Sequence, residues 1–250
     1  MSDSHPSPLD QVLAVHDSAD DPHEVSRALQ RGMIPVDAPR IEGFDLAAGT
    51  TVEDTGRGNT TWDHVRLRDG RIAILVMDVR ADGLPPAHIA GMARAALRTA
   101  AAASDDPAQM LRLANGALAD IHVEGVDQFV DCGVLVPEER GIVWASGGRM
   151  PAGILGRDGT FRQLGSHGPP LGMMDGFGYG TERAEMGAGD TVLVLSGGSV
   201  GLFRGAADLV AQVHGKPAGE IVATVHRAIR KAQEAEEKTE EISAVYLRKH

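Results

Sequence analysis

The feature that most constrains the fold of this chain is a series of short apolar stretches separated by tight turns. Strands are predicted at 128–136, 141–146, 153–155 and 161–164, with turns rich in Gly, Glu, Arg and Asp between them. A further hairpin is predicted from 181–186 and 190–195 across Gly187-Ala-Gly189. Because the strands follow one another as hairpins rather than alternating with helices, the pattern predicts antiparallel sheets with helices packed outside.

The first half of the chain is expected to supply a central strand. The run 72–79 is too apolar for a surface strand, and Arg68-Asp-Gly-Arg71 is a turn that joins it to a strand at 65–67. Further predicted strands lie at 41–49, which leads into a polar loop at 50–61, and at 242–247. Helices are predicted from Pro22 to about Met33, at 87–103, from Pro107 onward, at 206–213 and at 218–235.

Composition and periodicity indicate one large domain with an N-terminal arm. Hydrophobic residues make up 42% of the chain, enough for a full-sized core, and only 4% is aromatic, so aliphatic and small side chains must fill that core. No internal repeat or inserted linker divides residues 22–250. Residues 1–21 lack steady periodicity, and we expect them to form a flexible arm or a short docking helix.

The charge and the single cysteine restrict the compartment and the partners. A net charge of −11 argues against nucleic acid and anionic membrane surfaces, both of which require clustered Lys and Arg. No stretch approaches the ~20 apolar residues of a spanning helix, and the start of the chain does not resemble a signal peptide. Cys132 has no internal disulfide partner, which is typical of a reducing compartment. We therefore expect a cytoplasmic protein.

Nine segments, in a consistent order, resemble the motifs of one enzyme family. In the first half they are Ala28-Leu-Gln30 with Ile34-Pro35, Gly58-Asn-Thr-Thr-Trp-Asp63, Asp78-Val-Arg-Ala-Asp-Gly83 and Leu113-Ala-Asn115. In the second half they are Gln128-Phe-Val130, Ser146-Gly-Gly-Arg-Met-Pro151, Gly168-Pro-Pro-Leu-Gly172, Gly189-Asp-Thr-Val-Leu-Val-Leu195 and Glu240-Glu-Ile-Ser-Ala-Val245. Each motif is weak alone, but their order is specific. By these motifs the chain resembles the SpoIIE-type branch of the metal-dependent serine/threonine protein phosphatases, which are protein phosphatase 2C-like.

The resemblance implies a fold, a reaction and a class of partner. The implied fold is α+β, a four-layer α/β/β/α sandwich of two antiparallel sheets flanked by helices, which agrees with the hairpin pattern. The implied reaction is hydrolysis of a phosphoserine or phosphothreonine ester by water that two Mg²⁺ or Mn²⁺ ions activate. The SpoIIE-type branch acts in bacterial signal transduction and sigma factor regulation, on antagonists of anti-sigma factors.

The first half of the chain keeps only part of the metal ligands that the resemblance implies. The family's aspartate at a strand end is present as Asp78, and the glycine whose carbonyl usually helps to bind metal aligns with Ala81. The family's first-loop aspartate aligns with Thr60, or with Asn59 if the loop is shifted by one residue. Neither Thr60 nor Asn59 is a carboxylate, and hard divalent ions require carboxylate oxygen from the protein.

The C-terminal ligand positions are also altered. Gly197 stands where the family has an aspartate, and Glu240 aligns with the last aspartate, with Glu241 as a nearby substitute. Loss of two of the four acids leaves most of the charge of two divalent cations uncompensated. The sequence therefore predicts a pseudophosphatase, with no catalytic residue assigned, no cofactor, and residual metal binding restricted to Asp78 and Glu240.

Three functions stay open at this point. The favoured one is a regulatory protein that binds a phosphoprotein or an anti-sigma-antagonist-type partner without hydrolysing it. The alternative is an active phosphatase that uses Mn or Mg with a shifted ligand set, including Asp63, Asp82, Glu240 and Glu241. The third is a structural or oligomerisation domain, such as a homodimer, which would have no cleft near Asp78.

Most of these residues also have a purely structural interpretation. Asp78, Asp63 and Asp82 could cap turns, and Glu240 could belong to a solvated acidic run over 234–241. The histidines show no zinc-ligand spacing, and Ser196-Gly-Gly-Ser lacks the lysine of a phosphate-binding loop. Cys132, inside a predicted strand, is expected to be a small core residue.

Overall fold

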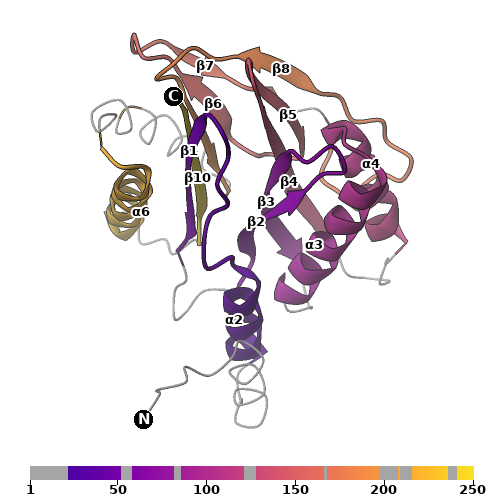
Figure 1. Cartoon of the computed structure of the whole chain (residues 1–250). Helices are drawn as coiled ribbons and strands as arrows, with labels where there is room; N and C mark the ends of the chain where they lie inside the picture. Colours follow the sequence, from indigo (N-terminus) through magenta and orange to yellow (C-terminus); the bar gives the residue numbers. More distant parts are fainter. Residues whose placement is uncertain are drawn as a thin grey trace, which may run out of the picture.

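The computed structural model describes residues 22–51, 58–81, 86–120, 128–165, 168–196, 208, 216–235 and 241–250. Within these ranges two five-stranded sheets stack face to face, and helices cover their outer faces (Figure 1). Sheet A has the strand order β1-β10-β9-β6-β7, and sheet B has the order β2-β3-β4-β5-β8. The predicted α/β/β/α sandwich is confirmed.

The elements have the following bounds. The strands of sheet A are β1 (Phe44–Thr50), β6 (Ala152–Leu155), β7 (Phe161–Gln163), β9 (Thr191–Leu195) and β10 (Ser243–Lys249). The strands of sheet B are β2 (Thr60–Arg66), β3 (Ile72–Ala81), β4 (Gln128–Glu138), β5 (Gly141–Gly147) and β8 (Glu182–Glu185). The helices are α2 (Pro22–Met33), α3 (Pro86–Ala103), α4 (Pro107–Ala119) and α6 (Ala218–Ala235).

Three apolar cores lie between the four layers. The core between the two sheets contains the fully buried rings of Trp62 and Trp144. A second core packs α3 and α4 against sheet B through residues such as Leu97 and Met110, and a third packs α6 against sheet A through Ile221. Successive residues of a strand therefore face different layers, as the pleat of a β-strand requires.

Helix α4 begins where the sequence predicts because two neighbouring residues favour a helix start. The carboxylate of Asp106 accepts a hydrogen bond from the backbone N–H of Ala108 at 3.2 Å, and Pro107 occupies the first turn, where no N–H donor is needed. None of the helices described in the structure has the length and hydrophobicity needed to span a bilayer.

The predicted hairpin between 181–186 and 190–195 is wrong. β8 pairs with β5 in sheet B, whereas β9 pairs with β6 and β10 in sheet A. The Gly187-Ala-Gly189 turn thus carries the chain from one sheet to the other. The burial of the two strands explains the difference, because β9 is buried along its whole length, as in a central strand, whereas β8 is mostly exposed, as at an edge.

The other predicted elements agree with the structure apart from their bounds. β3 lies between β2 and β4, as its apolar sequence predicts. β2 starts at Thr60, so 60–61 is strand rather than polar loop and the strand predicted at 65–67 begins earlier. The predicted arm at 1–21 lies outside the described residues, and so does the helix predicted at 206–213 except for residue 208.

Strand order in sheet A does not follow chain order. β10 comes last in the sequence but lies between β1 and β9, and its register with β1 runs from Phe44↔Lys249 to Thr50↔Ser243. The two most distant described strands of the chain are therefore hydrogen-bonded neighbours (Figure 1).

We predict that His226 on α6 makes the fold sensitive to mild acid. Burial against sheet A lowers the pKa of His226 to about 4, and Arg230 lowers it further, whereas a hydrogen bond with the Gly49 backbone opposes the shift. The unfolded chain thus binds more protons between pH 6.5 and pH 4. The free energy of unfolding should fall as pH drops through this window, by about 2 kcal/mol from this residue after allowance for partial exposure.

Chemical denaturation at pH 7 and at pH 4.5 measures this contribution. Because carboxylates also titrate in this range, the quantity to compare is the pH-dependent loss of stability in the wild type and in His226→Gln. The loss should be smaller in the variant, and equal losses would show that His226 is not the group responsible.

Candidate functional site

Asp78 lies near the end of β3 and faces the space between the two sheets. Its neighbours alternate, with Val76 in the core between the sheets and Met77 in the core under the helices, so Asp78 shares the inner face with Val76. The side chain is only 4% exposed. Asp78 is in register with Thr60 on β2 and with Asp131 on β4, and these three residues define the candidate site.

Thr60 fills its position with a cluster of buried hydroxyl groups. Its Oγ1 contacts the hydroxyl of Ser196, lies 3.1 Å from Ser243 Oγ, and lies 3.1 Å from the carbonyl oxygen of Met77. The backbone N–H of Ser243 donates to Ser196 Oγ at 2.7 Å, and Thr50 Oγ1 lies 2.7 Å from Ser243 Oγ. These neutral groups form hydrogen bonds with one another and so join β2 of sheet B to strands of sheet A.

Glu241 precedes β10 and is buried beside this cluster, with 3% of its surface exposed. Its Oε2 accepts hydrogen bonds from the backbone N–H of Gly58 at 2.8 Å, from the backbone N–H of Asn59 at 3.2 Å, and from Gln30 Nε2 at 3.2 Å. The solvated acidic run predicted over 234–241 is therefore wrong at its last residue, because loop and helix N–H groups compensate the burial of this carboxylate.

Asn59 links Glu241 to Asp78. While its backbone N–H points to Glu241, its side-chain amide donates to Asp78 Oδ1 at 2.9 Å. Gln30 Nε2 also donates to the carbonyl oxygen of Thr60 at 2.7 Å, so helix α2 is tied to the same point. The donor described for Asp78 is thus a side-chain amide.

Asp131 is a third buried carboxylate that the sequence analysis did not identify. It is 2% exposed, and its Oδ1 accepts from the backbone N–H of Arg149 at 3.0 Å. Its Oδ2 lies 3.4 Å from Arg80 Nε, an ion pair too long for a good hydrogen bond. Burial raises the pKa of Asp131, and the Arg149 amide and the charge of Arg80 oppose the rise.

A sequence signal for Asp131 does exist. Its in-register partner Asp78 faces inward, and so do Gly133 and Leu135 two and four residues further along β4. A charged residue at an inward position of a central strand is rare unless a partner neutralises it, so strand periodicity alone marks Asp131.

Asp63 does not belong to this site. It is in β2 rather than in a loop and faces α3, where its Oδ2 lies 2.8 Å from Arg94 Nε and 2.6 Å from Arg98 Nη1. This is the face of sheet B opposite to Asp78, because Trp62 on the inner face precedes Asp63 directly. The cap predicted for Asp63, and its place in a shifted ligand set, are both wrong, and the residue instead fixes α3 onto the sheet.

The other predicted ligand positions are only partly described. Ala81 is the last residue of β3 and pairs with Gln128. Asp82, Gly197 and Glu240 lie outside the described residues. Cys132 is fully buried in β4, and this burial raises the pKa of its thiol, in agreement with its predicted place in the core.

The described residues do not fit a pair of divalent cations. No group of three or more His, Cys, Asp or Glu side chains within the described ranges is close enough to hold a metal ion. Asp78 and Glu241 already accept protein N–H donors, and Thr60, Ser196 and Ser243 are neutral. Two metal ions that share a site need several carboxylates to balance their charge.

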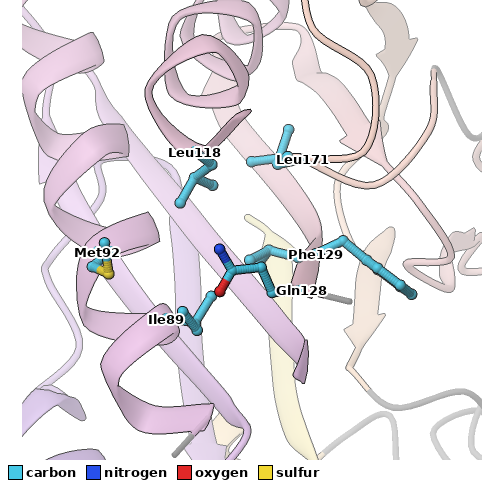
Figure 2. Close-up of a pocket in the computed structure, with 8 residues that line it drawn as sticks. Ile89, Met92, Leu118, Gln128, Phe129 and Leu171 are labelled. Atoms are coloured by element: carbon cyan, nitrogen blue, oxygen red, sulfur yellow. The ribbon is translucent and has the colours of Figure 1, made fainter. Parts of the chain in front are cut away.

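A small apolar pocket lies elsewhere, between α3, the end of α4 and the start of β4 (Figure 2). Its lining includes Ile89, Met92, Leu118 and Leu171, and Gln128 is the only polar side chain among its lining residues. The pocket is on the helix-covered face of sheet B, opposite to Asp78, because Val130 of its lining belongs to the core under the helices. None of its lining residues has a titratable or nucleophilic side chain.

Comparison with known families agrees with the fold. The family described as Stage II sporulation protein E (SpoIIE) matches residues 68–249, which cover most of the two sheets. No curated protein sequence matches the chain significantly.

Solved structures share the architecture. The SiaA-PP2C domain of Pseudomonas aeruginosa is 19% identical with a TM-score of 0.71, and the match covers 95% of this chain and 98% of that one. The RsbU and RsbW domains of a Mycobacterium tuberculosis protein are 20% identical with a TM-score of 0.67, covering 83% of this chain and 62% of that one. The PP2C phosphatase domain of SpoIIE from Bacillus subtilis, solved with a fragment of its regulatory domain, is 15% identical with a TM-score of 0.62, covering 82% and 62%. The chain thus spans less than two thirds of the latter two structures.

Proposed function

The chain belongs to the SpoIIE-type branch of the metal-dependent protein phosphatase family, and we propose that it is a regulatory member that binds a serine-phosphorylated signalling protein without hydrolysing it. The observation that carries this proposal is Thr60. By resemblance it occupies the family's first aspartate position, and its hydroxyl contacts those of Ser196 and Ser243.

The chemistry of the family explains why Thr60 matters. Hydrolysis of a phosphate ester at neutral pH requires metal ions to lower the pKa of the attacking water and to neutralise the phosphoryl oxygens. A threonine hydroxyl neither carries negative charge nor replaces a carboxylate ligand to Mn²⁺ or Mg²⁺. Asp78 and Glu241 already accept hydrogen bonds from protein N–H groups, and Thr60 adds no negative charge beside them.

The class of partner follows from the relatives. One similar structure combines RsbU and RsbW domains in a single protein, and another is described as part of the bacterial stressosome, a modular system that controls secondary messenger signalling. We propose a partner of the same kind, a phosphoprotein or anti-sigma-antagonist-type protein in the cytoplasm. The net charge of −11 disfavours nucleic acid and anionic membranes as alternatives.

Hydrolysis and binding of phosphoserine peptides test this proposal together. With excess Mn²⁺, phosphate release should stay at background and should be equal for the wild type and Asp78→Asn. The chain should still bind a subset of phosphoserine peptides more tightly than their unphosphorylated counterparts. Metal-dependent turnover that Asp78→Asn abolishes would instead establish an active phosphatase with a reduced ligand set.

A further inference from the structure

Three buried carboxylates lie in or beside the candidate site, and each one already has a hydrogen-bond donor from the protein itself. Asp78, Asp131 and Glu241 are 4%, 2% and 3% exposed. A buried carboxylate is costly unless hydrogen bonds or an opposite charge compensate it. In a metal-dependent enzyme the cations supply most of that compensation, so the source of compensation here indicates whether this centre needs a metal.

N–H groups from a loop and from α2 compensate two of the acids. Glu241 Oε2 accepts three hydrogen bonds, from Gly58, Asn59 and Gln30. Asp78 Oδ1 accepts one from the side-chain amide of Asn59. Gly58 and Asn59, two consecutive residues, thus place N–H donors on Asp78 of sheet B and on Glu241, which precedes β10 of sheet A, as anion-binding loops do.

A nearby cation partly compensates the third acid. Arg80 is two residues beyond Asp78 on β3, so both side chains leave the same face of the strand. The Arg80 guanidinium lies 3.4 Å from Asp131 Oδ2, and the Arg149 backbone N–H binds the other oxygen. The chain also packs closely against the other oxygen, because a Cβ atom at Gly148 would lie 1.7 Å from Asp131 Oδ1.

We propose that this centre is a metal-independent joint between the two sheets, in which Asn59, Gln30 and Arg80 take the place of divalent cations. The inference rests on the proposed function and explains it physically, because the N–H donors on Asp78 and Glu241 already offset part of the negative charge that would attract a divalent cation. The hydroxyls of Thr60, Ser196 and Ser243 lie buried against one another beside these acids and add no charge.

The decisive variant is Asn59→Asp, which replaces the amide with a carboxylate of nearly equal size. In the wild type, Mn²⁺ should not change the melting temperature, and the electron paramagnetic resonance signal of free Mn²⁺ should be undiminished. Asn59→Asp should melt about 5 °C or more lower in chelator, because a donor on Asp78 becomes a like charge. Added Mn²⁺ should then raise its melting temperature and reduce the free-ion signal.

Asn59→Ala is the matched control. It should also melt lower, because Asp78 loses its donor, but it should gain no response to Mn²⁺, because no ligand is added. The inference would be overturned if the wild type bound Mn²⁺ stoichiometrically and Asp78→Asn abolished that binding. It would also be overturned if the Asn59→Ala variant were as stable as the wild type. If Asn59→Asp does not fold, the wild type and Asn59→Ala still decide the question.

The two proposals fail in different ways. Wild-type Mn²⁺ binding without hydrolysis of phosphoserine peptides would overturn the metal-independent joint and leave the regulatory function standing. Hydrolysis without detectable bound Mn²⁺ would overturn the regulatory function and leave the joint standing.

Discussion

Replacing Glu241 with alanine should lower the free energy of unfolding by about 4 kcal/mol. The reason is the number of donors that lose their acceptor together. The backbone N–H groups of Gly58 and Asn59 and the amide of Gln30 all bind the same carboxylate oxygen. A small cavity left by the missing side chain adds to the loss. Urea denaturation monitored by tryptophan fluorescence measures the effect.

Two further variants separate this explanation from a general effect of lost charge. Glu241→Gln keeps one carbonyl oxygen in place and should recover at least half of the lost stability. Glu185→Ala removes an exposed glutamate from the edge strand β8 and should change stability by less than about 0.5 kcal/mol. A Glu241→Ala variant that loses no more stability than Glu185→Ala would contradict the buried network.

Replacing Gly133 with alanine should cost about 3 kcal/mol, through crowding rather than lost contacts. A Cβ atom at Gly133 on β4 would lie 2.3 Å from Cη2 of Trp144 and 2.9 Å from Cγ of Met150. The indole cannot withdraw easily, because it is fully buried and its Nε1–H donates to the carbonyl oxygen of Gly165 at 3.0 Å. Thermal and urea denaturation should both report the loss.

Gly116 on α4 supplies the control for this prediction. A Cβ atom there would meet nothing within 4 Å, so Gly116→Ala should stabilise the chain slightly through helix propensity. A double-mutant cycle with Trp144→Phe identifies the cause, because Gly133→Ala should be less harmful once the ring is smaller. Strictly additive effects of the two changes would show that Trp144 is not the obstacle.

The fold was predictable because its signals are local. Hairpin turns such as Arg68-Asp-Gly-Arg71 and the fully apolar run of β3 identify antiparallel strands and a central position without knowledge of distant contacts. The connection after β8 was not predictable in this way. Gly187-Ala-Gly189 suits a tight hairpin, but whether the next strand stays in the same sheet depends on which core has room for it.

The candidate site was predictable only in part. Asp78 lies near the end of the apolar run that forms β3, so its position was visible from the sequence. Glu241 was not, because its donors Gln30 and Gly58 are 211 and 183 residues away in the chain, and its own surroundings in sequence are acidic and polar. Gly133 shows the same limit, since a glycine within a strand indicates a close approach but does not name the ring that approaches.

The position of β10 in sheet A has a consequence for biosynthesis. Sheet B needs nothing beyond β8, so its five strands can assemble with α3 and α4 while later residues are still being translated. Sheet A cannot assemble in this way, because β1 and β9 are joined only through β10. Until residues 243–249 have left the ribosome, the inner face of sheet B therefore has no complete sheet to pack against. The nascent chain therefore exposes Trp62 and Trp144 during that interval, when it depends most on chaperones.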